Sequence, residues 1–174
     1  KIDTQILIEA YRSFLSDKNQ YIAETFDYDS LIETSGGIAY KSIKSKYIVF
    51  TEGFGIHKNP YFKQLPLEGT KGELVTIHAP ELKLETILKS SIFVIPMESD
   101  NYLVGSTYEW TDKTNTPTSK AKSQLLEKLE LLISCSYEVV NQRAGIRPTV
   151  SDRRPLVGCH PNHNRMYVLN GLGT

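Results

Sequence analysis

The sequence has few of the features that mark disulfide-stabilised, membrane-spanning or nucleic-acid-binding proteins. Among its 174 residues only Cys135 and Cys159 are cysteines, too few and too far apart for a disulfide framework. No apolar run approaches the roughly 20 residues of a membrane helix, and the first ten residues lack the pattern of a signal peptide. The 20 basic residues equal the 20 acidic ones, so bulk charge does not favour nucleic acid. We therefore expect a cytoplasmic protein with no membrane span and no nucleic-acid partner.

What the sequence does contain is enough apolar residues, 40% of the total, to bury a core. Two segments, residues 4–15 and 121–133, repeat apolar residues at helical spacing and predict amphipathic helices. The stripe of the first consists of Leu7, Ala10, Tyr11, Phe14 and Leu15, and that of the second of Leu125, Leu129, Leu132 and Ile133.

The remaining apolar runs favour β-strands. Residues 47–50 are apolar throughout and end at a glycine turn, which is typical of a strand buried on both faces. Four runs between Gly72 and Trp110 follow one another at hairpin spacing and predict a meander of successive hairpins, with the second helix packed on one face. The fold class is α+β, with an antiparallel or mixed β-sheet and flanking helices.

The stretch from Ala144 to Gly158 is the most informative part of the sequence. It places three arginines, one aspartate and two prolines between two strand-like runs. Gly145 lets a strand bend and Pro148 fixes the next φ, so the guanidinium of Arg147 is presented from a rigid backbone. A guanidinium offers a planar set of donors that suits bidentate capture of a carboxylate.

A simpler interpretation of the arginines stays open, in which Arg147, Arg153 and Arg154 are surface charges paired with Asp152.

A His-x-x-His pair at residues 160–163 lies in a Pro/Asn turn without a third ligand, so we expect no metal site there.

The end of the chain carries an unusual pattern. Residues 165–174 predict a buried strand that runs into a Gly-x-Gly turn at Gly171 and Gly173, and such a turn normally opens onto a helix that receives an anion. No helix follows, and the chain begins near a helix cap without an initiating Met. We expect a fragment of a longer polypeptide whose N-terminal part is missing.

Taken together, AGIRPTVSDRRPLVG and the later MYVLNGLGT resemble the C-terminal signature of the FAD-dependent D-amino-acid oxidase family, which includes glycine oxidase and sarcosine oxidase. Three further pieces, KYIVFTEGFG, LPLEGTKGELV and FVIPMESDNYLVGSTYEW, resemble family segments and occur in the family's order. The family's N-terminal Gly-x-Gly-x-x-Gly turn has no match in the chain.

This resemblance implies an FAD-dependent oxidoreductase that oxidises a small-molecule amino acid or related amine by hydride transfer to flavin. It implies that residues 1–65 are part of an FAD-binding α/β domain, that residues 66–155 form a substrate-binding sheet domain, and that residues 156–174 return to the FAD-binding domain. The alternative is a non-catalytic sheet module that binds an anion or a partner chain.

The resemblance also assigns roles to individual residues. Arg147 would anchor the substrate carboxylate, and Tyr108 and Trp110 would line the substrate pocket, although ordinary hairpin packing explains these two aromatics about as well. The residues that would let the backbone approach the cofactor are Gly53, Gly171 and Gly173.

We predict that the purified 174-residue chain is colourless, because no segment of it matches the glycine turn that would hold the FAD pyrophosphate. Visible absorption of the purified chain tests this directly. A yellow preparation with stoichiometric flavin would contradict the prediction.

Overall fold

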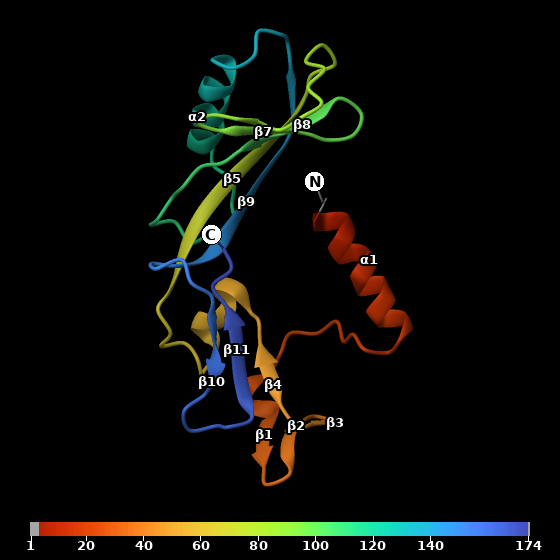
Figure 1. Ribbon diagram of the computed structural model, residues 1–174, viewed down its shortest axis with the longest axis vertical. Coiled ribbons are helices and arrows are strands. Elements are labelled where there is room, and N and C mark those ends of the chain that lie inside the picture. The colour runs from red at the N-terminus through yellow and green to blue at the C-terminus, as the bar shows by residue number, and fades with distance from the viewer. Residues whose placement is uncertain (1–3, 174) are drawn as a thin grey trace. The chain divides into compact units, whose positions relative to one another are not determined.

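A computed structural model describes residues 4–173 and divides the chain into two compact units, residues 1–44 and 45–174 (Figure 1). Helices and sheets occur together, as the predicted α+β class requires. Within the described residues no helix is long and apolar enough to cross a membrane.

The first unit contains one helix and a small sheet. Helix α1 (Thr4–Asp17) forms where the sequence predicts it, yet none of its residues is buried, and Tyr11 in the predicted stripe is 59% exposed. A 3-10 turn at Tyr28–Ser30 precedes the antiparallel hairpin of β1 (Leu31–Thr34) and β2 (Gly37–Tyr40). Strand β3 (Ile43–Ser45) lies beside β2 in the same sheet.

The second unit is built on a five-stranded antiparallel sheet in the order β6-β7-β8-β5-β9. Its two long strands are β5 (Leu67–His78) and, at one edge of the sheet, β9 (Glu138–Val150); they run side by side in Figure 1. The shorter strands are β6 (Leu88–Lys89), β7 (Phe93–Pro96) and β8 (Asn101–Gly105).

The prediction that the four runs pair as successive hairpins is wrong for the first pair of strands, β5 and β6. Strand β5 pairs with β8 and β9, and β6 pairs only with β7. The pairing with β8 and β9 gives the backbone of β5 hydrogen-bond partners on both sides. The second predicted run, residues 82–90, carries the charged residues Lys83, Glu85 and Lys89 and forms only the two-residue strand β6 at the sheet edge.

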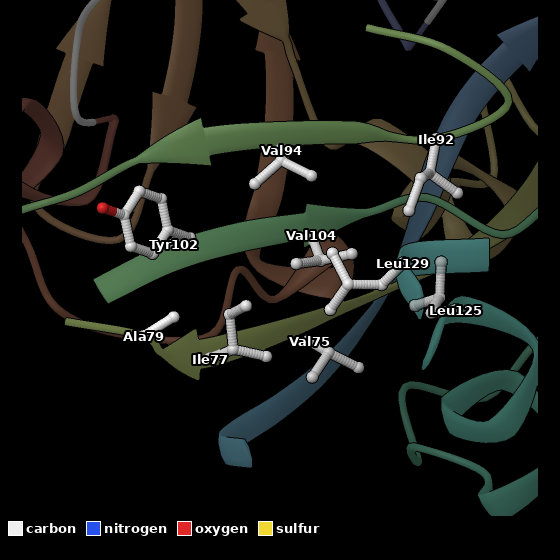
Figure 2. Packing of buried hydrophobic residues seen from close by; sticks show 9 residues of the cluster. All are labelled: Val75, Ile77, Ala79, Ile92, Val94, Tyr102, Val104, Leu125 and Leu129. Carbon is white, nitrogen blue, oxygen red and sulfur yellow. The ribbon is translucent and has the colours of Figure 1, made fainter. Parts of the chain in front are cut away.

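The core of this unit lies between one face of the sheet and helix α2 (Ser119–Glu130), as Figure 2 shows. Thr118 caps the helix by accepting a hydrogen bond from the backbone N–H of Ala121. Leu125 and Leu129 are fully buried against the sheet, and Leu132 and Ile133 are partly buried, which confirms the predicted packing of this helix. The sheet residues of the core are Val75, Ile77, Ala79, Ile92, Val94, Tyr102 and Val104.

A second, mixed sheet joins segments that are far apart in the sequence. Strand β11 (Met166–Asn170) pairs in parallel with β4 (Ile48–Phe50) and antiparallel with β10 (Leu156–Cys159). A 3-10 helix, Gly53–Lys58, follows β4. The prediction that β4 is buried on both faces is wrong, because Phe50 is buried but Val49, on the opposite face of the strand, is 54% exposed.

We predict that Leu129→Ala lowers the free energy of unfolding by about 2–5 kcal/mol, because it leaves a cavity between α2 and the sheet. Leu131→Ala is the matched control, since Leu131 lies two residues further on, at the C-cap of the helix, and is 85% exposed. Urea denaturation measures both variants. Equal losses in the two would show that α2 does not pack as described.

Candidate functional site

Arg147 lies in strand β9 and not in a loop between strands. Strand β9 continues in register through Gly145 and Pro148, with Arg147 paired to Thr70 of β5. The guanidinium crosses the sheet over Gly72, where a Cβ atom would collide with it. The missing side chain at Gly72 is what lets the guanidinium lie flat against β5.

The guanidinium is held by the segment that follows β8. Nη2 of Arg147 donates to Oγ of Ser106 at 2.7 Å, and Nη1 donates to the carbonyl oxygen of Thr107 at 3.3 Å. Cζ lies 4.7 Å from the ring centroid of Tyr108, a cation–π contact. All three contacts are neutral, so they orient the guanidinium without cancelling its charge.

The alternative in which Arg147 pairs with Asp152 does not hold. The Asp152 carboxylate accepts a hydrogen bond from the backbone N–H of Arg154 at 3.0 Å. In the part of the chain that the structure describes, no ion pair joins Arg147 to a carboxylate.

Arg147 opens onto a cavity of about 680 Å³. The cavity lies on the face of the sheet opposite the core, because Thr70, Gly72 and Leu74 alternate along β5 with the core-facing residues. Of the predicted site residues, Arg147, Tyr108, Trp110 and Gly173 all line it. The other lining residues are Glu68, Thr70, Leu74, Phe93, Ser106, Thr149, Val150, Ser151 and Arg153.

Sequence reasoning missed Ser106 and Glu68. Glu68 faces Thr149 across the β5–β9 ladder, a neighbour that only the strand register reveals. Ser106 belongs to the family-like segment FVIPMESDNYLVGSTYEW, but only the fold shows that its hydroxyl accepts a hydrogen bond from Arg147.

The two remaining predicted glycines meet at the carboxyl ends of parallel strands. Gly53 follows β4 with φ +57°, and Gly171 follows β11 with φ +75°, conformations that favour glycine. The buried Asn170 joins them, since its Nδ2 donates to the carbonyl of Gly53 at 2.9 Å and its Oδ1 accepts from the N–H of Gly171 at 2.8 Å. Such crevices are where open α/β sheets bind nucleotide cofactors, so these residues fit one part of an FAD site.

Gly173 connects this turn to the cavity. Its N–H donates to the carbonyl of Pro148 at 3.0 Å, and a Cβ atom at Gly173 would lie 2.6 Å from the nitrogen of Pro148. The glycine turn therefore ends against the strand that carries Arg147.

A polar cluster lies on the other face of β5. The buried ammonium of Lys71 donates to Asp112 at 2.5 Å, and this hydrogen bond lowers the pKa of Asp112 to about 2. The same bond raises the pKa of Lys71. Hydrogen bonds from the hydroxyl and backbone N–H of Thr111 lower the pKa of Glu109 to about 2.

The His160 and His163 rings lie 4.7 Å apart, and Tyr61 packs edge-on against His163. Among residues 4–173 there is no group of three or more His, Cys, Asp or Glu side chains that could hold a metal.

Comparisons with known proteins identify the family and the fold of the chain. A family described as "FAD dependent oxidoreductase" matches residues 22–174. Glycine oxidase of Bacillus subtilis is 26% identical over 124 residues, which are 67% of this chain and 34% of the relative. Glycine oxidase of Bacillus licheniformis is 24% identical over 174 residues, or 92% of this chain and 47% of the relative. The crystal structure of glycine oxidase from Geobacillus kaustophilus has a TM-score of 0.66 at 22% identity, over 82% of this chain and 39% of that one.

The chain thus spans less than half the length of these relatives. At this identity, the likeness to the solved structure establishes the fold.

We predict that Asp112→Asn destabilises the protein at neutral pH and that the difference from wild type shrinks in acid. The folded pKa of Asp112, about 2, is below its ordinary value of 3.8. The stability that this carboxylate contributes is therefore present above pH 3.8 and is lost as the pH falls toward 2. Urea midpoints measured at several pH values test this. Asn115→Ala, an uncharged change in the same segment, should shift the midpoint equally at each pH.

Proposed function

The chain belongs to the family of FAD-dependent oxidoreductases, and on that premise we propose that the whole protein oxidises an amino acid or a related amine with FAD as electron acceptor. FAD is the cofactor of this family, and the predicted resemblance to D-amino-acid and glycine oxidases is confirmed. Because the chain spans 34% and 47% of two glycine oxidases, the activity of the whole protein is a proposal.

The observation that carries the proposal is the placement of Arg147. Its guanidinium borders a cavity large enough for an amino acid, and its contacts with Ser106, Thr107 and Tyr108 are neutral. Because none of the described residues 4–173 pairs its carboxylate with Arg147, the positive charge favours an anionic ligand. A planar guanidinium favours a carboxylate that accepts two parallel hydrogen bonds.

The aromatic side chains support a role in shaping the cavity. Tyr108 covers one face of the guanidinium, and Trp110 lines the same cavity. Both rings are largely exposed in this chain, at 70% and 57%, which favours a ligand-facing role over hairpin packing. In the proposed site they exclude water around the bound carboxylate and so strengthen its pairing with Arg147.

The glycine turns support the cofactor part of the proposal. Gly53, Gly171 and Gly173 bring backbone close to the end of the mixed sheet and to Pro148 of the cavity strand. We assign residues 1–65 and 156–174 to an FAD-binding domain and residues 66–155 to a substrate-binding domain. FAD, when bound, supplies the two-electron acceptor. The residues of this chain bind the substrate, orient its reacting carbon and exclude water.

We predict that Arg147→Ala lowers kcat/KM for an amino acid by about ten- to a hundredfold or more, because a hydrogen bond to a charged group is worth about 1.5–3 kcal/mol. Arg147→Lys should recover part of the loss, since an ammonium cannot reproduce the planar donor pair. Arg154→Ala is the control, an exposed arginine of the next loop.

Each variant is measured on an amino acid and on the amine that lacks its carboxylate. A carboxylate anchor matters only for the first substrate. Equal losses on both would assign Arg147 to the fold or to cofactor binding. Binding of a carboxylate with no oxidation by the flavin-loaded wild type would favour the alternative, a non-catalytic anion-binding module.

A further inference from the structure

The strongest feature outside the cavity is the buried side chain of Lys71. The residue is fully buried, and its ammonium donates to Oδ2 of Asp112 at 2.5 Å and to the carbonyl of Thr116 at 2.6 Å. A longer contact of 3.4 Å reaches the hydroxyl of Thr114. Every one of these partners belongs to the loop of residues 106–118, which connects β8 to α2.

Glu73 holds the far end of the same loop. It lies two residues from Lys71 on the same face of β5, with its carboxylate 3.7 Å from the ammonium. Its carboxylate accepts hydrogen bonds from the backbone N–H and the hydroxyl of Thr118, each at 2.8 Å, and from the amide of Gln142 at 2.9 Å. The loop is thus fixed at its middle by Lys71 and at its end by Glu73.

The backbone of the loop continues the sheet beside Lys71. Lys71 and Glu109 form an antiparallel bridge, with N–H to carbonyl distances of 2.8 and 2.9 Å. Because side chains alternate along an extended segment, Tyr108 and Trp110 face the opposite side from Glu109, which is the side of the cavity. Lys113 adds a further tie, since its ammonium donates to the carbonyls of Trp110 and Gly69.

The first residues of the loop contact both Glu73 and Arg147. The hydroxyl of Thr107 accepts from the N–H of Glu73 at 2.9 Å, while the carbonyl of the same residue accepts from Arg147. Ser106 and Tyr108, on either side, make the other two contacts of the guanidinium. Lys71 and Arg147 therefore donate hydrogen bonds to the same loop from opposite faces of the sheet.

We infer that Lys71 is a positioning residue for ligand recognition: it holds loop 106–118 in the one arrangement in which Ser106, Thr107 and Tyr108 aim the Arg147 guanidinium into the cavity. A buried ion pair contributes little net stability, because desolvation offsets most of its Coulomb energy, whereas removal of one partner leaves a costly unpaired charge. Such a pair specifies one loop geometry against others. This inference rests on the proposed carboxylate site, and it does not require that the protein be an oxidase.

The first test uses the fluorescence of Trp110, the only tryptophan of the 174-residue chain, during titration with acetate. We expect acetate to change the emission saturably in the wild type and not in Arg147→Ala. Lys71→Met should raise the apparent Kd for acetate by about tenfold or more, as expected when a charged hydrogen-bonding group is misaligned. Asp112→Asn, which keeps the buried lysine, should act in the same direction and decides the matter if Lys71→Met does not fold.

Lys83→Met is the matched control, because it removes an exposed lysine paired to Asp100 at 3.2 Å, away from the cavity. It should leave the acetate affinity unchanged. Equal affinity in Lys71→Met, Asp112→Asn and wild type overturns the inference, as does a wild type that shows no acetate response.

The second test uses the whole protein loaded with flavin, not the 174-residue chain alone. Lys71→Met and Asp112→Asn should lower kcat/KM for an amino acid about tenfold, mainly through KM, with little change for the amine that lacks the carboxylate. Equal losses on the two substrates would make Lys71 a residue of the fold alone. If the wild type oxidises no amino acid while acetate still binds in a Lys71-dependent way, the proposed oxidase function fails and the positioning role stands.

Discussion

The pairing of β5 with β9 is the interaction on which the rest of the second unit depends. Twelve residues of β5 pair antiparallel with β9, from Leu67 opposite Val150 to His78 opposite Glu138, with one shift of register between Thr76 and Ile77. Because side chains alternate across this ladder, one face receives the core and the other receives Thr70, Arg147 and the cavity. A slip of one residue in the register would exchange the two faces and remove both the core and the site.

Local patterns predicted the parts of the molecule whose signals are local. The apolar stripe of α2 gave its position and its buried residues, Leu125 and Leu129. The sequence around Arg147 singled out that side chain, because Gly145 lets the backbone bend before it and Pro148 fixes the φ angle after it. The same local pattern predicted that Arg147 lies between two strand-like runs, whereas Arg147 and Pro148 both lie in β9, an edge strand in which a proline is tolerated.

The parts that sequence reasoning missed depend on contacts between distant segments. Strand β5 pairs with β8 and not with β6, the next strand in the sequence, and no hairpin spacing indicates such a pairing. Lys71 and Asp112 are 41 positions apart, and neither looks unusual in a chain with as many basic as acidic residues. The burial of Lys71 is what distinguishes it, and burial follows only from the assembled sheet.

Glycines on the cavity face show how one strand can serve both a core and a site. A Cβ atom at Gly72 would collide with the Arg147 guanidinium, and one at Gly105 would collide with Leu74 and lie 2.8 Å from the Phe93 ring. Glycine in a strand costs about 0.5–1 kcal/mol relative to alanine. The valines and isoleucine that the same strands place on the opposite face bury enough apolar area to offset that cost, at about 1.5–3 kcal/mol each. The sheet can therefore keep one face open for a ligand because its other face is closely packed.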